Sequence, residues 1–207
     1  MVADPPAAAW VDVLLEIWRV GQGRSMVGPG DPRVHLERAL AVAGAVDVPP
    51  ARALDLGSGA GIPGLALAGL WPQSCWVLLD AANRRVELLR DAVARLGWGD
   101  RVAVVHGRAE ELGRDPAHRE VYDLVTSRSF GPPAVTAECG GSFVRVGGHL
   151  LVTEPPIEGD RWALDGLEPL GLVPERRVAG VQVLRRTREL DERYPRRSGV
   201  PAKRPLF

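Results

Sequence analysis

The chain has 207 residues, enough for one α/β domain with a full hydrophobic core. Its 26 basic and 26 acidic side chains balance, which excludes a global electrostatic attraction to nucleic acid, so any basic patch has to be local. Apolar residues make up 45% and charged residues 25%, as in an ordinary globular protein. Cys75 and Cys139 have no ligand-like spacing, so we expect packed thiols rather than a disulfide or a metal site.

The first 50 residues are predicted to form a helical extension. Apolar residues recur at helical spacing over residues 6–20, which predicts an amphipathic helix. Asp12, Glu16 and Arg19 interrupt this run, so it is not a membrane span, and no basic region precedes it as in a signal peptide. We therefore expect a cytoplasmic protein with no membrane partner.

A second helix is predicted between Asp31 and Gly44. The side chain of Asp31 can cap its first turn, and Pro32 suits that turn because no backbone N–H is needed there. This helix carries His35. A lone histidine on a half-apolar helix is either structural or a substrate contact, and the sequence leaves both interpretations open.

From residue 51 to residue 192, strands and helices alternate. This alternation predicts a mostly parallel sheet of seven strands with helices on both faces. The last two strands are close enough in sequence to form a hairpin through Ala179 and Gly180. Strands are expected at 52–56, 75–80, 101–106, 121–126, 149–153, 172–178 and 181–187, and helices at 62–70, 83–97, 132–144 and 160–170, with a short one after residue 107.

The first of these strands leads into three glycines at alternate positions, Gly57, Gly59 and Gly61. Glycine is needed where the chain turns at positive φ, or where a ligand approaches the backbone without meeting a Cβ. A helix is expected to begin just after the glycines, near Ile62 and Pro63. A strand, a glycine-rich turn and a helix N-terminus together form a cradle for a nucleotide-like ligand.

Two cofactors fit this cradle. The glycines match the dinucleotide fingerprint G-x-G-x-x-G, which is weak evidence when it stands alone. Residues 55–61 also match D-x-G-x-G-x-G, the pattern of the S-adenosylmethionine loop in class I methyltransferases. Asp55 can order the loop and face the cationic end of that cofactor, and Asp80, which ends the next strand, can accept hydrogen bonds from ribose hydroxyls. The two acids favour S-adenosylmethionine and a Rossmann-like class I methyltransferase fold.

Ligands of open α/β sheets bind at the carboxyl ends of the strands. The glycine loop, Asp80, residues 108–111, residues 127–130 and Glu154 are therefore expected to meet at one edge of the sheet. Arg128 follows the fourth strand at this edge, where a cation can grip a phosphate, a guanine oxygen or the cofactor carboxylate. We take Arg128 as the candidate catalytic residue.

Several segments occur in the order found in one known family. They are DLGSGAGIPGLALA from Asp55, LLDAANRRVELLR around Asp80, GRAEEL, TSRSF and the tail RYPRRSGVPAKRPL. On these residues the chain resembles, over 31–207, the bacterial small-subunit ribosomal RNA guanine-N7 methyltransferases, also called the glucose-inhibited division protein B family. The resemblance implies a ribosomal RNA or small ribosomal subunit partner.

The resemblance also implies roles for individual residues. Gly57 and Ile62 should contact S-adenosylmethionine, Ala109 and Glu110 should lie at its adenine, and Arg128 should lie in the reaction pocket. Guanine N7 has an exposed lone pair and no proton to lose, so its methylation needs in-line placement rather than a general base or a metal.

Residues 193–207 form the only strong basic cluster. Prolines at 195, 201 and 205 predict an extended tail without helix or sheet. Its cations either bind RNA phosphates or belong to a solvated tail, and both interpretations stay open. The candidate RNA contacts are Arg193, Arg196, Arg197, Lys203 and Arg204.

The chain departs from the family pattern at two charged positions. Where the family has H-x-x-D-S, this chain has His35-Leu-Glu-Arg-Ala39, and where the family ends its fifth strand with Lys-Gly, this chain has Glu154-Pro155. The cofactor half therefore matches better than the substrate half. Two alternatives follow, a methyltransferase that acts on a small metabolite and a cofactor-binding pseudoenzyme that serves as an interaction module. The oligomeric state is left open.

Overall fold

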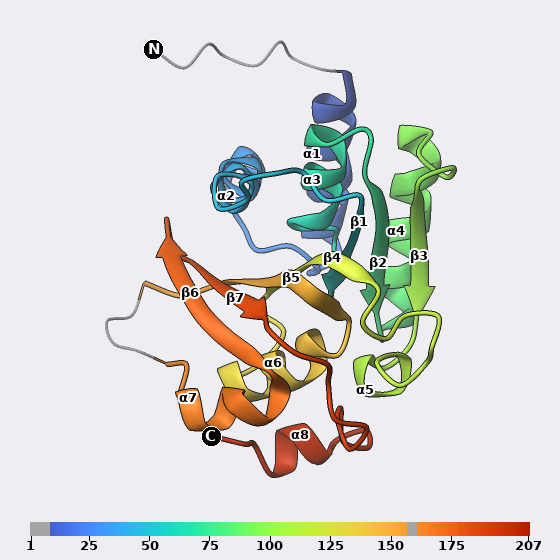
Figure 1. Ribbon diagram of the computed structural model, residues 1–207. Coiled ribbons are helices and arrows are strands. Elements are labelled where there is room, and N and C mark those ends of the chain that lie inside the picture. The colour runs from blue at the N-terminus through green and yellow to red at the C-terminus, as the bar shows by residue number, and fades with distance from the viewer. Residues whose placement is uncertain (1–8, 157–160) are drawn as a thin grey trace.

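The computed structural model describes residues 9–156 and 161–207 (Figure 1). The helices are α1 (Ala9–Gly23), α2 (Arg33–Ala43), α3 (Gly64–Leu70), α4 (Asn83–Leu96), α5 (Ala109–Leu112), α6 (Pro133–Gly141), α7 (Leu164–Leu167), the 3-10 helix η1 (Glu168–Leu170) and α8 (Val200–Lys203). The strands are β1 (Arg52–Leu56), β2 (Cys75–Asp80), β3 (Val102–His106), β4 (Tyr122–Arg128), β5 (Val144–Thr153), β6 (Leu172–Val178) and β7 (Val181–Arg186).

The seven strands form one sheet in the order β3-β2-β1-β4-β5-β7-β6. Strands β1 to β5 run parallel, and β7 is antiparallel to both of its neighbours. The register places Leu56 beside Leu79 and Ser127, so the carboxyl ends of β1, β2 and β4 meet at one edge. The predicted mostly parallel sheet is confirmed, as is the β6–β7 hairpin.

Alternate residues of each strand enter two different hydrophobic cores, as the pleat of a strand requires. On β1, Ala53 packs with α1 to α4 on one face, whereas Leu54 packs with α6 and α7 on the other (Figure 1). Trp18 of α1 is fully buried in the first core and donates a 3.0 Å hydrogen bond to the carbonyl of Ala60 in the glycine loop. The N-terminal helices are therefore packed against the segment that follows β1. The predicted boundaries at residues 50 and 192 stay a prediction.

Some predicted elements differ from the observed ones. The long helix expected at 160–170 is two short helices, α7 and η1, and residue 160, like residues 6–8, lies outside the described residues. Strand β5 begins at Val144 rather than at residue 149, because its early part still pairs with Tyr122 across a bulge. Cys139 is buried as expected, but Cys75 is exposed, so the prediction of two packed thiols is wrong for Cys75.

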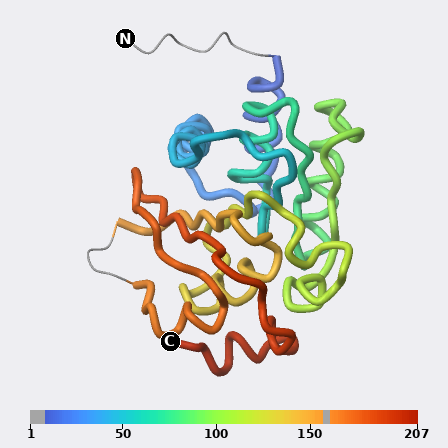
Figure 2. Tube along the Cα trace, viewed as in Figure 1, coloured from blue at the N-terminus to red at the C-terminus, as the bar shows by residue number. Residues whose placement is uncertain are grey.

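The prediction of an extended tail without helix is wrong. The tail contains α8, and Pro201 lies in its first turn, where a missing N–H costs no hydrogen bond. Figure 2 shows this C-terminal segment running along the domain and ending beside α7, where the ring of Phe207 packs against Gly166. In the part of the chain that the structure describes, no helix is long and apolar enough to cross a membrane.

Candidate functional site

The glycine loop after β1 is a backbone surface held between two strands. Gly57, Gly59 and Gly61 have φ of 66°, 59° and 80°, in the left-handed region that glycine enters without a steric penalty. The Gly59 N–H donates to the Asp80 carboxylate at 2.9 Å, which fixes the loop to the end of β2. A Cβ on Gly57 would lie 2.8 Å from the Phe130 ring, so glycine lets that ring cover the loop.

Asp55 orders this loop from behind. Its side chain is 1% exposed, and its two oxygens accept hydrogen bonds from the Gly64 N–H at 3.1 Å and the Thr126 hydroxyl at 2.8 Å. A Cβ on Gly64 would lie 2.6 Å from Asp55 Oδ2, which explains the glycine that follows Pro63. Burial raises the pKa of Asp55 to about 6, and these hydrogen bonds oppose the rise.

A cavity of about 300 Å³ lies at the ends of β1, β2 and β3. Gly57, Asp80, Ala109 and Glu110 line it together with Phe130. We call it the cofactor cavity. Asp80 accepts from the N–H groups of Gly59 and Ala82 at 2.9 Å each, and a carboxylate has further lone pairs for a ribose diol. The acid, the partly exposed backbone of Gly57 and the apolar walls fit the ribose and adenine of S-adenosylmethionine.

Glu110 is held in its ionised form at the wall of this cavity. Burial alone opposes ionisation, but the Gly199 N–H and the Arg108 guanidinium outweigh it, so the pKa of Glu110 lies below its usual value. Glu110 Oε1 lies 2.9 Å from the Gly199 nitrogen and 3.2 Å from Arg108 Nη2. Because Ala202 of α8 also lines the cavity, the tail forms part of its wall.

A second cavity of about 660 Å³ adjoins the first and shares Phe130 and Gly131 with it. We call it the substrate cavity. His35 of α2 and Arg128 of β4 line it, with Arg128 Nη1 3.4 Å from His35 Nδ1. Burial, followed by the charges of Arg128 and Arg38, lowers the pKa of His35. The imidazole is therefore neutral at pH 7 and can accept from Arg128.

Glu154 lies in the wall of the substrate cavity, and its charge is compensated there. The side chain is 2% exposed. Its carboxylate lies 3.5 Å from Arg161 and 3.4 Å from Arg177, and it accepts a 2.9 Å hydrogen bond from the Trp162 indole. The acid at this departure from the family pattern is thus an internal ion-pair centre rather than an isolated negative charge.

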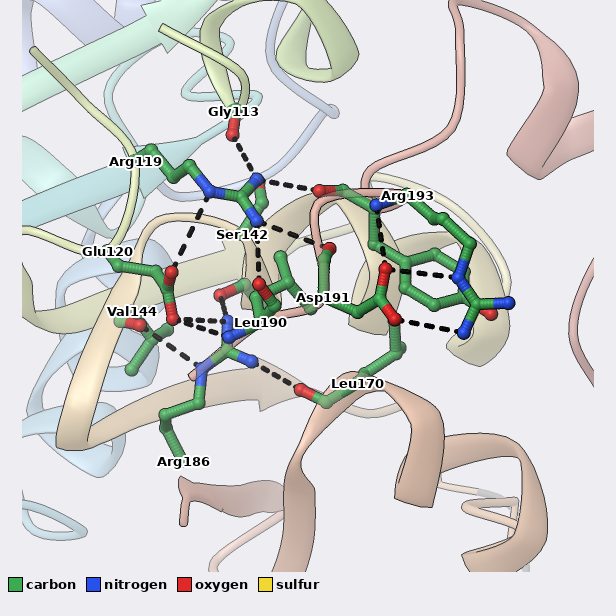
Figure 3. Close-up of polar contacts among 12 residues, drawn as sticks. Gly113, Arg119, Glu120, Ser142, Val144, Leu170, Arg186, Leu190, Asp191 and Arg193 are labelled. Carbon is green, nitrogen blue, oxygen red and sulfur yellow. Dashed lines mark hydrogen bonds and ion pairs between the residues drawn. The ribbon is translucent and has the colours of Figure 1, made fainter. Parts of the chain in front are cut away.

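Two of the tail arginines predicted to contact RNA are occupied by carboxylates of the protein itself. Arg196 forms a two-pronged ion pair with Glu138 of α6, with nitrogen–oxygen distances of 2.9 and 2.6 Å. Arg193 pairs with Asp191 at 2.9 Å (Figure 3). Arg197, Lys203 and Arg204 are exposed. The tail therefore offers a smaller free positive charge than its composition indicates.

A further network fastens the start of the tail to the loop before β4 (Figure 3). Arg119 donates to the carbonyls of Tyr194 at 2.6 Å and Leu190 at 2.9 Å, while Glu120 accepts from the Leu190 N–H at 2.8 Å. Arg186 of β7, fully buried beneath them, donates to carbonyls of three surrounding segments and lies 3.9 Å from Glu120. The network identifies the tail as a packed part of the fold.

The structure places the predicted site residues in three groups: those that line the cofactor cavity, those that line the substrate cavity and those that line neither. Gly57, Asp80, Ala109 and Glu110 line the cofactor cavity, and His35 and Arg128 line the substrate cavity. Asp55, Gly59, Gly61 and Ile62 line neither cavity. Asp55 and Ile62 are buried, and the Asp55 carboxylate accepts hydrogen bonds from Gly64 and Thr126. The expectation that Asp55 and Ile62 contact the cofactor stays a prediction.

Phe130, Arg38 and Ala202 are among the lining residues to which sequence reasoning gave no role. Phe130 was visible only as the last letter of the SRSF segment, and Arg38 only as a departure from a pattern. Ala202 carried no signal, because nothing local places α8 beside residues 107–110. Among residues 9–156 and 161–207, no group of three potential metal ligands is found.

Comparison with known proteins identifies the family of the chain. A family model described as rRNA small subunit methyltransferase G matches residues 32–159. Proteins named Ribosomal RNA small subunit methyltransferase G are similar to the chain: the one from Symbiobacterium thermophilum is 37% identical and the match covers 81% of this chain and 74% of that protein. The one from Thermotoga neapolitana is 40% identical, and the match covers 74% of this chain and 71% of that protein.

Solved structures confirm the fold. A methyltransferase from Geobacter sulfurreducens superposes with a TM-score of 0.59 at 16% identity, covering 90% of this chain and 92% of that one. Its sequence is too distant to carry more than the fold. The family match and the close relatives settle the rest: the chain belongs to the rRNA small subunit methyltransferase G family and is an S-adenosylmethionine-dependent methyltransferase.

Proposed function

We propose that the protein methylates guanine N7 in small-subunit ribosomal RNA. The observation that carries this proposal is the pair of adjoining cavities at the carboxyl edge of the sheet, which share Phe130 and Gly131. One cavity has the groups that hold a nucleoside cofactor, and the other is larger and lined by cations. The relatives are named ribosomal RNA small subunit methyltransferases, which supplies the RNA class.

The site residues have separate tasks in this proposal. S-adenosylmethionine supplies an electrophilic methyl group when it is bound. Asp80 and the backbone around Gly57 fix the ribose end, and Ala109 and Glu110 border the adenine. Asp55 holds the loop in shape through its bonds to Gly64 and Thr126. None of these roles requires a proton to move.

Guanine is expected to enter from the substrate cavity. N7 carries its own lone pair, so the protein has to align the base and exclude water rather than remove a proton. Neutral His35 next to Arg128 agrees with this, because His35 fixes the guanidinium and is not needed as a base. Arg128 is then the polar group placed to orient the incoming nucleotide.

The direct test incubates the protein and labelled S-adenosylmethionine with three substrates: assembled small subunits, naked ribosomal RNA and a pool of small metabolites. We expect label in RNA only, at one guanosine that becomes sensitive to borohydride and aniline cleavage. Label in metabolites alone would support the small-molecule alternative. Cofactor binding without any transfer would identify a pseudoenzyme.

A further inference from the structure

Among the residues that the structure describes, those lining the substrate cavity carry more positive charge than their one carboxylate balances. Its charged lining residues in the described part of the chain are Arg38, Arg128, Arg161 and Glu154. Glu154 already pairs with Arg161 at 3.5 Å and, from outside the cavity, with Arg177 at 3.4 Å. The guanidinium groups of Arg38 and Arg128 take no part in these ion pairs.

Neither of these two arginines has a carboxylate within ion-pair distance among residues 9–156 and 161–207. Arg128 is half-buried and contacts neutral His35. Arg38 is exposed and lies one turn after His35 on α2. The two guanidinium groups also repel each other. Burial lowers the pKa of Arg128 most, and the positive charge of Arg38 is the next largest cause. Like charges held around one cavity raise its free energy until an anion binds between them.

We propose that Arg38 and Arg128 form a binding site for a backbone phosphate next to the target nucleotide of the RNA. This proposal rests on the proposed function. The planar guanidinium fork matches two oxygens of a phosphate, which a point charge does not. An enzyme that modifies a base acts on a single-stranded segment or takes the base out of its stack, and the adjacent phosphate then enters the site with the base. The base then lies near Phe130, and its phosphate lies at the rim near Arg38.

The competing anion is the carboxylate of the cofactor, and the location of Arg38 argues against it. Arg38 lines the substrate cavity alone, whereas Gly57 and Asp80 line the cofactor cavity. A residue that served the cofactor would alter cofactor affinity when removed. A residue that binds the RNA backbone would alter RNA affinity and its dependence on salt.

The test compares Arg38→Ala with Arg33→Ala, a matched control. Both arginines are exposed on α2, but Arg33 lies 4.0 Å from Asp31 and outside the cavity. For each variant we would measure RNA affinity between about 50 and 200 mM salt, cofactor affinity by calorimetry, and KM and kcat on small subunits. A third variant, Arg38→Lys, restores the charge without the fork.

We expect Arg38→Ala to weaken RNA binding about tenfold at low salt and to lower the slope of log affinity against log salt by about one. KM for RNA should rise accordingly, while cofactor affinity and kcat stay near the parent values. Arg38→Lys should restore the salt slope and part of the affinity. Arg33→Ala should match the parent.

Two results would overturn the proposal. One is an Arg38→Ala protein that binds RNA as Arg33→Ala does, and the other is a loss of cofactor affinity in place of RNA affinity. Both are distinct from failure of the proposed function, which would show as a parent protein that transfers no methyl group to RNA.

Discussion

Replacing Arg196 by alanine is expected to destabilise the fold, because it leaves a buried charge without its partner. Glu138 is 1% exposed, and Arg196 meets both of its oxygens, at 2.9 and 2.6 Å. Breaking a buried ion pair by removing one partner typically costs about 3–5 kcal/mol. The backbone N–H of residue 196 still reaches Glu138 at 2.7 Å, and a quarter of the Arg196 side chain is exposed. We therefore expect the lower end, about 3 kcal/mol.

Urea unfolding followed by tryptophan fluorescence measures this loss, and the chain has six tryptophans. With a urea dependence of about 2 kcal/mol per molar, the midpoint should fall by about 1.5 M. Arg193→Ala is the matched control, because Arg193 is also a tail arginine paired with a carboxylate, that of Asp191. Both partners are solvent-exposed, so the midpoint should scarcely move.

A double-mutant cycle refines the test. Replacing Glu138 and Arg196 together removes the orphaned charge, so the double variant should be more stable than the sum of the two single losses indicates. Cofactor affinity should fall with Arg196→Ala, because α8 follows Arg196 and supplies Ala202 to the cofactor cavity. If Arg196→Ala and Arg193→Ala unfolded at the same urea concentration, the assignment of the tail as a stabilising clasp would be wrong.

Three further changes test the site. Gly59→Val puts a branched side chain at φ of 59° in the loop, and calorimetry should show cofactor affinity at least about tenfold weaker. Arg128→Ala should unfold like the parent but reduce single-turnover methyl transfer about a hundredfold. Asp55 has a native pKa of about 6 against 3.8, so the folded state holds its proton more tightly and stability falls as pH rises from about 4 to 6. This fall in the free energy of unfolding is on the order of 3 kcal/mol. It should appear in urea midpoints measured across this pH range and be absent from Asp55→Asn.

The fold and the cofactor cavity were predictable because their signals are local in sequence. Strand–helix alternation determines the parallel sheet, and the sheet brings the ends of its strands to one edge whatever the loops do. Gly57 and Asp80 each lie within two residues of a strand end, so their meeting follows from strand order alone. Asp55 is an instructive exception. Its place at the strand end was visible, but its direction into the core depends on Gly64 and Thr126.

The tail was not predictable, because its conformation depends on partners far along the chain. Prolines indicate an extended segment only when nothing else holds it. Here two distant residues fix the backbone before α8 begins. Glu138 binds Arg196 from 58 residues away in the sequence, and Arg119 binds Tyr194 from 75 residues away. Charge counting overestimated the free charge of the tail for the same reason, because Glu138 and Asp191 pair with two of its arginines. RNA contact by the remaining cations stays a prediction.

The two charged departures from the family pattern, Arg38 and Glu154, both line the substrate cavity and are therefore best considered together. Where the pattern has an acid, the chain has Arg38, and where it has a lysine, the chain has Glu154. The exchange leaves the formal charge of these two positions unchanged while it moves the cation from the end of β5 to α2. Glu154 is then bound internally by Arg161 and Arg177, and Arg38 faces solvent. If the RNA backbone follows the free cation, it should pass over α2 in this protein. Glu154→Lys should lower the urea midpoint of unfolding, because Arg161 and Arg177 would lose the Glu154 carboxylate and face a third cation at its buried position.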